Sequence, residues 1–183
     1  MRDEGDSTTS LLTIAERFQE DACLRFLLSD MAGLRRQEAS LPFNILAVLA
    51  NKPEYLVLQE DTLGKRDSQG RTALMHAAKK GYANCVEKLL GEQGCRDTNG
   101  NTALFYAIEA NSLECVNLLT DELRLNDTNN VPPYRRAFEL SHVNLTEHLL
   151  KLAAPDSTSP TDAAYRLGEQ ELLRRLLVLR AGQ

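Results

Sequence analysis

The sequence predicts an all-α protein built from repeated pairs of short helices. The stretch "DSQGRTALMHAAKKGYANCVEKLL", which begins at Asp67, is followed by the similar "DTNGNTALFYAIEANSLECVNLLT", which begins at Asp97. Within each stretch, apolar residues recur at helical spacing and are interrupted once, near the middle. The chain is rich in Leu and Ala, and only 5% of its residues are aromatic, so the core has to be built from aliphatic side chains.

The same template of about thirty residues can be laid along the whole chain. Units are expected to begin near residues 5, 36, 67, 97, 127 and 154. The unit at 127 replaces a turn glycine by Asn130, which tolerates positive φ, and opens its first helix with Pro132 and Pro133. The last unit is shorter by three residues and contains Ser159 followed by Pro160.

Each unit is expected to hold two short antiparallel helices. In the central units these pairs are predicted at 72–90 and 102–120. Thr72 and Thr102 precede the first apolar run, where an N-cap belongs, and Gly81 suits the end of a first helix. The D-x-x-G sequence that starts each unit is typical of a turn. Helices of about ten residues are marginal alone, so the units must gain stability by stacking.

The runs "DSQGRTALMHAAKKG" and "DTNGNTALFYA" resemble ankyrin repeats, whose signature is T-P-L-H-x-A in a unit of about 33 residues. T-A-L at 72–74 and 102–104 stands where T-P-L belongs, and Pro133 keeps the proline. The units are shorter than the family length, and the family histidine is absent from its usual place. The resemblance implies an ankyrin-repeat α-solenoid of stacked helix-turn-helix units. We expect residues 1–183 to form a single domain of about six repeats, with the first and last repeats acting as caps.

Composition excludes several other classes of protein. A net charge of −5 argues against a nucleic-acid partner, which requires a basic face. No run of about 18 apolar residues exists, so no membrane span is predicted, and the polar N-terminus is unlike a secretory signal. The four cysteines form no CxxC pair and are expected to be free thiols in a reducing cytoplasm. We expect a cytoplasmic monomer.

No metal, cofactor or catalytic site is predicted. Cys23, Cys85 and Cys115 share one position in their units, which suggests either a metal ladder or small buried side chains. Stacked helices lie about 8–10 Å apart, whereas zinc holds each sulfur about 2.3 Å away, so burial is the favoured interpretation. The three histidines form no Ser-His-Asp or Cys-His arrangement that the repeat geometry supports, so the chain is not expected to be an enzyme.

The ankyrin resemblance implies a protein-binding surface made of the turn tips and the exposed side of the first helices, on the concave face. The residues expected there are Arg71, His76, Lys79, Lys80, Asn101, Tyr106, Glu109, Arg136 and Glu139. Tyr106, Arg71 and Arg136 are the expected anchors, because Tyr and Arg dominate binding energy at interfaces. This surface predicts a noncatalytic scaffold or adaptor with a protein partner.

Two alternatives stay open at this point. The amino-acid sequence of the repeats also resembles degenerate ankyrin arrays of protists, some of which are joined to kinase domains. The chain could therefore be a regulatory or targeting module associated with a protein kinase, although it contains no kinase motif itself. The terminal stretch "GEQELLRRLLVLRAGQ" could be an amphipathic helix for a partner or membrane. A terminal cap, with leucines buried and arginines outward, is the favoured interpretation.

Overall fold

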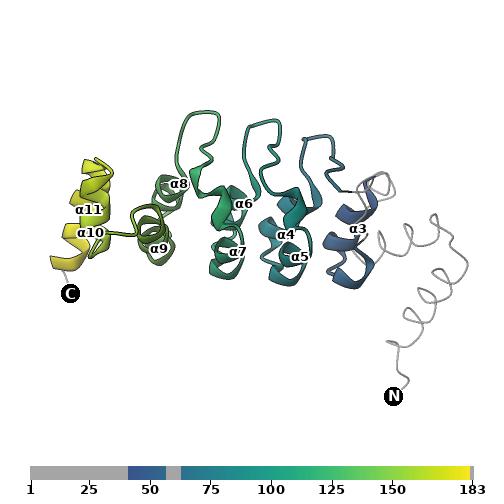
Figure 1. Cartoon of the computed structure of the whole chain (residues 1–183), viewed down its shortest axis with the longest axis horizontal. Coiled ribbons are helices and arrows are strands. Elements are labelled where there is room, and N and C mark those ends of the chain that lie inside the picture. Colours follow the sequence, from purple (N-terminus) through teal and green to yellow (C-terminus); the bar gives the residue numbers. More distant parts are fainter. Residues whose placement is uncertain (1–40, 57–62, 182–183) are drawn as a thin grey trace, which may run out of the picture.

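The computed structural model describes residues 41–56 and 63–181, which form a row of helix pairs without any strand (Figure 1). The elements are α3 (Phe43–Leu49), η2 (Pro53–Tyr55), α4 (Ala73–Lys80), α5 (Ala83–Lys88), η3 (Leu90–Glu92), α6 (Ala103–Glu109), α7 (Leu113–Leu118), η4 (Thr120–Arg124), α8 (Pro133–Glu139), α9 (Val143–Ala153), α10 (Pro160–Arg166) and α11 (Gln170–Ala181). The unit expected near residue 5, with Cys23, lies outside the described residues.

The two central helix pairs are present where the sequence predicts them. The pair expected at 72–90 is α4 with α5, and the pair expected at 102–120 is α6 with α7. In three units, the connection that follows the first helix contains a residue in the left-handed region: Gly81 at φ 71°, Asn111 at φ 52° and Ser141 at φ 61°. Loss of the glycine from the sequence therefore leaves the bend between the paired helices unchanged, because Asn and Ser adopt the same conformation.

The first helices are capped by buried glutamates that the sequence reading did not single out. Thr72 occupies the N-cap of α4 as predicted, but its side chain makes no capping hydrogen bond. The carboxylate of Glu92, in η3 of the same unit, accepts the backbone amides of Leu74 at 2.8 Å and Gly64 at 2.9 Å. Glu122 serves α6 in the same way, with both bonds at 2.8 Å. Each glutamate ties the second half of a unit to its first helix.

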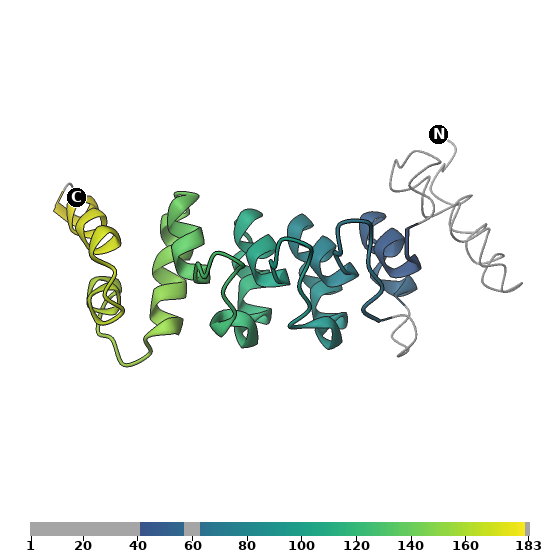
Figure 2. The ribbon, with the colours of Figure 1, turned by 90° about the horizontal axis from the view of Figure 1, so that it is seen from above.

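Apolar side chains form one long core along the row, a smaller one at its C-terminal end, and a third around Leu46 and Ala47 of α3. The large core runs from α3 to α9, and α4 packs directly against α6. Figure 2 shows these pairs lying side by side from α3 onwards. Cys85 and Cys115 are fully buried in this core, as small hydrophobic side chains would be. The small core contains Leu150 of α9 together with Ala163, Ala164, Leu172 and Leu176.

Two parts of the array depart from the template. The unit expected near residue 36 has α3 as its first helix, but the described part of its second half is only the single turn η2. In the last unit, α11 buries Leu172 and Leu176 but leaves Leu177 and Val178 exposed. Among the residues described here, no helix is both long enough and apolar enough to span a bilayer.

Candidate functional site

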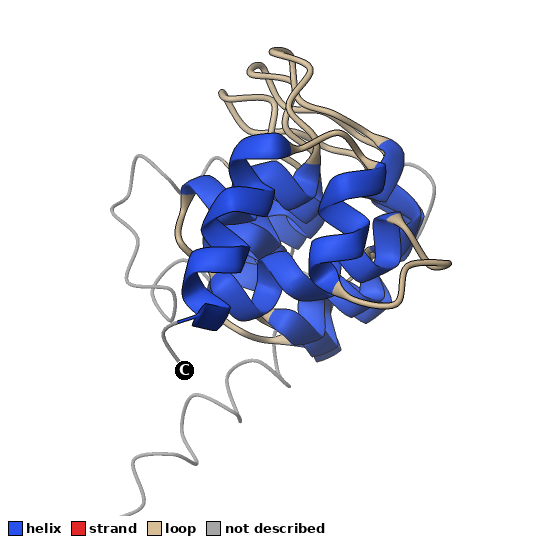
Figure 3. Ribbon diagram, turned by 90° about the vertical axis from the view of Figure 1, so that its left-hand side faces the viewer, coloured by secondary structure: helices blue, strands red, loops and turns tan. Residues whose placement is uncertain are grey.

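The turns that begin the units project from one side of the row, where they gather above the helices (Figures 1 and 3). Each turn is built around an aspartate. Asp67 accepts the backbone amides of Gln69 and Arg71 through Oδ1, both at 2.9 Å. Asp97 and Asp127 repeat the arrangement in their own units. The D-x-x-G pattern thus specifies a turn whose shape is fixed by its own carboxylate.

Neighbouring turns are joined by threonine side chains. The Thr98 hydroxyl donates to the Gln69 carbonyl at 3.0 Å, and the Thr128 hydroxyl donates to the Asn99 carbonyl at 2.9 Å. The backbone amide of Thr98 also donates to Gln69, at 3.1 Å. All four of these residues are exposed at the turn tips. The tips therefore form a connected ridge, which keeps their outward groups in fixed relative positions.

Two arginines also link neighbouring turns of the ridge. The Arg66 guanidinium donates to the carbonyl of Gly70 in its own turn and to the carbonyl of Arg96 in the next. Arg96 repeats this with Gly100 and Asn126, both at 2.7 Å. Because each guanidinium spans two turns, these arginines belong to the framework of the array. They are poor candidates for partner recognition.

Two of the predicted contact residues are buried. His76 and Tyr106 were expected to be exposed, but they are 8% and 7% exposed. Nε2 of His76 lies 3.0 Å from Oδ2 of Asp67, and the Tyr106 hydroxyl donates to Oδ2 of Asp97 at 2.6 Å. That expectation of exposure was wrong, because each of these two side chains reaches back to the turn aspartate of its own unit. Both residues hold the turn onto the helix.

The pKa values of both Asp67 and His76 are lowered in the folded array. Burial alone would raise the pKa of Asp67, but hydrogen bonds from the Arg71 amide and guanidinium, from His76 and from the Gln69 amide lower it to about 2. Burial lowers the pKa of His76 below its ordinary value, against the opposing effect of Asp67. At neutral pH Asp67 is therefore ionised and can only accept hydrogen bonds. His76 is neutral and carries its proton on Nε2.

The other predicted residues of the first helices are accessible and lie in a row. This first-helix row consists of Lys79, Lys80, Glu109, Arg136 and Glu139. The carboxylate of Glu109 lies 3.5 Å from the Arg136 guanidinium across the unit boundary, and Arg136 lies 3.6 Å from Glu139. The row therefore runs continuously over successive units. Its two lysines have no carboxylate partner within the described part of the chain.

The remaining predicted residues lie between the row and the ridge. Arg71 is largely covered, and its guanidinium pairs with Asp67 at 2.8 Å. Asn101 is half-buried, and its backbone holds Asp97 through both its amide and its carbonyl. Lys79 links the row to the turn side, since its ammonium group lies 5.6 Å from the centroid of the Tyr106 ring. The structure thus brings the predicted residues onto one side, but several of them stabilise the surface rather than form it.

The residues that sequence reasoning missed were marked by the same period that revealed the repeat. Arg66 and Arg96 stand immediately before the turn aspartates of consecutive units, and Glu92 and Glu122 stand thirty residues apart. In this chain, these charged residues recur at the repeat period because they make the same hydrogen bonds within the framework of successive units. Across the described ranges, no group of three or more His, Cys, Asp and Glu side chains is placed to hold a metal ion.

Comparison with known proteins agrees with this geometry. Residues 44–131 match the family described as ankyrin repeats, in three copies. Among solved structures, the chain is similar to the ankyrin repeat domain of Bcl-3, described as a unique member of the IkappaB protein family. The two chains are 21% identical, the match covers 91% of this chain and 84% of that one, and the TM-score is 0.59. No match was found among curated proteins. The predicted ankyrin resemblance and all-α solenoid are confirmed.

Proposed function

Because the chain is an ankyrin repeat protein, with three copies of the repeat within residues 44–131, we propose that it is a noncatalytic scaffold or adaptor that binds a protein partner. The partner-binding surface consists of the first-helix row and the turn tips. The observation that supports this most directly is the accessibility of the row along consecutive units. The side chains of the row are not packed into the core, whereas the residues around them hold the turns onto the helices.

The charges of the row favour a partner with a matching pattern. Lys79 and Lys80 present two cations at one end, whereas Glu109, Arg136 and Glu139 form a linked group with one net negative charge at the other. A partner segment with carboxylates over the lysines and a cation over Glu139 would be oriented along the row. Such complementarity improves orientation and association rate more than raw affinity.

A cytoplasmic location is consistent with the thiols. The described cysteines, Cys85, Cys95 and Cys115, are free, which suits a reducing compartment. Two of them are buried and have raised pKa values because burial disfavours the thiolate. They would therefore be unreactive in the folded array.

Affinity capture with charge-exchanged variants tests the proposal. The test variant is Lys80→Glu with Glu139→Lys, which exchanges one charge at each end of the row without changing net charge. The matched control is Glu87→Lys with Lys151→Glu, which makes the same exchange on exposed second-helix positions. Proteins retained on the immobilised array are quantified by mass spectrometry, after circular dichroism has shown that both variants fold.

A partner that uses the row should be depleted by about fivefold or more with the test variant and should be retained by the control. Equal retention by both variants would show that the row does not mediate binding. If the depleted protein is a protein kinase, the chain is better described as a regulatory or targeting module of that kinase. That outcome would retain the surface but change the role.

A further inference from the structure

The last helix pair repeats the preceding pair position by position. α10 begins 27 residues after α8, and α11 begins 27 residues after α9. The bend within each pair is also alike, because Ser141 and Gly168 both adopt a positive φ, of 61° and 74°. Each residue of the last pair therefore has a counterpart 27 positions earlier that holds the same place in the preceding pair. At the end of the row, the matched residues are Phe138 with Tyr165, Thr146 with Leu173, and Leu150 with Leu177.

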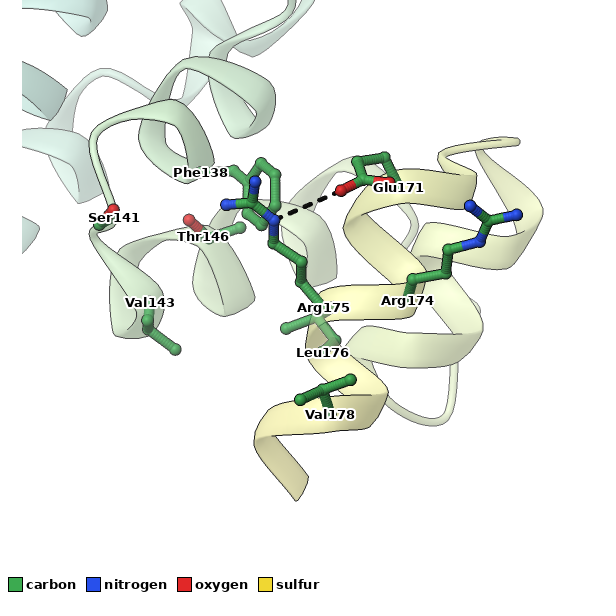
Figure 4. Close-up of a pocket in the computed structure, with 9 residues that line it drawn as sticks. All are labelled: Phe138, Ser141, Val143, Thr146, Glu171, Arg174, Arg175, Leu176 and Val178. Atoms are coloured by element: carbon green, nitrogen blue, oxygen red, sulfur yellow. Dashed lines mark ion pairs between the residues drawn. The ribbon is translucent and has the colours of Figure 1, made fainter. Parts of the chain in front are cut away.

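In the preceding pair, these three positions face the unit that follows. Leu150 is fully buried in the small core, among side chains of α10 and α11, and Phe138 packs against the same core. Thr146 is 1% exposed and lies with Phe138 on the side of the pair that faces α11 (Figure 4). This side of a helix pair is therefore the surface on which the next pair stacks.

In the last pair, the matched positions are not covered. Tyr165 is 74% exposed, Leu177 is 53% exposed and Leu173 is half-buried. These three residues are named the C-terminal face. Figure 2 shows α10 and α11 at the end of the row, with no described element beyond them. Because the end repeat of a soluble array requires a polar outer face, an apolar one marks a surface to which another surface binds.

The C-terminal face is distinct from the side of α11 that faces the preceding pair. On that inner side, Arg175 and Val178 border a cleft of about 470 Å³ beside α8 and α9 (Figure 4). The Arg175 guanidinium lies 5.1 Å from the centroid of the Phe138 ring, so it closes this side onto the preceding pair. Leu173 and Leu177, four residues apart, follow a different stripe of the helix.

The opposite end of the described row offers no apolar counterpart. Leu46 and Ala47 of α3 are fully buried, and so is every residue from 44 to 48. A head-to-tail contact between two copies would therefore find no exposed large apolar side chain on α3. The counterpart that the described chain does supply is the same face of a second copy. Two identical faces meet about a two-fold axis.

Charged groups near the face do not oppose such a contact. Arg166, which follows Tyr165, pairs with Asp162 at 3.2 Å. Arg174 has no carboxylate partner in the described part of the chain, and Figure 4 shows its guanidinium at the outer edge of α11. Its long, exposed side chain can keep the charge in water at the rim of a contact, where salt weakens the repulsion between copies.

We propose that two copies of the chain associate through their C-terminal faces about a two-fold axis, with Tyr165 and Leu177 of each copy packed against the C-terminal face of the other. Each copy then covers the last helix pair of the other, as α10 and α11 cover Phe138 and Leu150. A monomer, the state expected from the sequence, is the result that would refute this proposal. If the first-helix row binds a partner, the dimer displays two rows and can hold a repetitive partner twice, but the association itself does not depend on that function.

The contact is small, so the dimer should be weak. Three side chains of each copy contribute, whereas a stable interface draws on about 20–30 residues from each partner. We expect a dissociation constant on the order of 10–500 μM. Sedimentation equilibrium of the full chain, at concentrations from about 5 μM to about 1 mM, measures it.

Two variants on different helices disrupt the face: Tyr165→Asp on α10 and Leu177→Asp on α11. Leu113→Asp on α7 is the matched control, because Leu113 is 48% exposed and Leu177 is 53% exposed. Circular dichroism first establishes that all three variants fold. The dissociation constant should rise by at least about tenfold in each face variant and should stay unchanged in Leu113→Asp.

A photocrosslink determines which surfaces meet. Benzoylphenylalanine replaces Tyr165 in one preparation, which is mixed with isotope-labelled parent chain and irradiated. Mass spectrometry then identifies crosslinked peptides that contain one labelled and one unlabelled partner. In a two-fold dimer through the C-terminal face, these crosslinks should fall within residues 160–181 of the labelled copy.

Any of three results would overturn the proposal. The first is a parent chain that stays monomeric at concentrations up to about 1 mM. The second is a dimer that neither face variant weakens, or that Leu113→Asp weakens equally, which would place the contact elsewhere or show nonspecific association. The third is crosslinking to residues outside 160–181, or oligomers that grow beyond a dimer, which would identify a head-to-tail arrangement.

Discussion

At the residue scale, the carboxylates of the turn aspartates stabilise the fold of the array. Asp67 accepts four hydrogen-bonding groups from Gln69, Arg71 and His76 while its side chain is only 3% exposed. A carboxylate so fully engaged stabilises the fold only while it is ionised. This gives the array a defined sensitivity to acid.

The pKa of Asp67 is lowered from 3.8 to about 2, so its contribution is present above pH 4 and is lost as the pH falls towards 2. We expect this residue to account for roughly 2 kcal/mol of the free energy of unfolding at neutral pH. Urea denaturation of the parent and Asp67→Asn at several pH values between 7 and 3 measures it. The difference between the two proteins should shrink towards low pH. Parallel curves would contradict the assignment.

At the element scale, buried carboxylates replace the threonine caps that the sequence favoured. Glu122 is 1% exposed and accepts the amides of Leu104 and Gly94. Glu122→Gln loses the charge and turns amide hydrogens towards one of these donors, so we expect unfolding to become easier by about 1–3 kcal/mol. Glu114→Gln, on an exposed face of α7, should change stability by less than about 0.5 kcal/mol. Thermal or urea denaturation compares them, and a similar effect at both sites would disprove the capping role.

The sequence predicted the helix pairs well because their signals are local. Apolar spacing, T-A-L and D-x-x-G each act within one unit, and the central unit boundaries follow from them. What could not be predicted is where a side chain reaches across the unit. The ankyrin resemblance placed His76 and Tyr106 on the exposed side of the first helices, yet both turn back to an aspartate nine residues earlier.

The connected ridge depends on close contact between neighbouring turns. Gly100 has φ 75°, and a Cβ atom there would lie 2.3 Å from Cγ2 of Thr128. Gly94 has a similar φ of 78°, but a Cβ atom there would meet nothing within 4 Å. We therefore expect Gly100→Ala to destabilise the array by at least about 1 kcal/mol more than Gly94→Ala, which carries the same backbone strain. Denaturation of both variants, together with Gly100→Ala/Thr128→Ser, isolates the contact. If Thr128→Ser restores none of the stability that Gly100→Ala removes, the contact with Thr128 is not the cause of the loss.

At the scale of the whole molecule, the main contacts between the described helices lie within one unit or between adjacent units, as in a linear array of neighbours. Because the core is divided into separate clusters, the units are not equally well supported. α10 and α11 are held by the small core around Leu150 and by Glu169, whose carboxylate lies 3.3 Å from the Tyr134 hydroxyl and 3.8 Å from the Arg135 guanidinium. The first-helix row, by contrast, is carried by the large core.

Because this support is unequal, we expect the C-terminal helix pair and the central helix pairs to unfold with different free energies. Leu172 is 1% exposed in the small core, so Leu172→Ala should leave a cavity that loosens α10 and α11 by about 2–5 kcal/mol. Because the described contacts of those helices with the rest of the array are with the preceding unit, backbone hydrogen exchange should accelerate across 160–181 and stay unchanged across 73–118. Leu104→Ala, in the large core, should accelerate exchange in both segments. Mass spectrometry of exchanged peptides distinguishes the variants, and uniform acceleration in Leu172→Ala would mean that the described array unfolds as one cooperative unit.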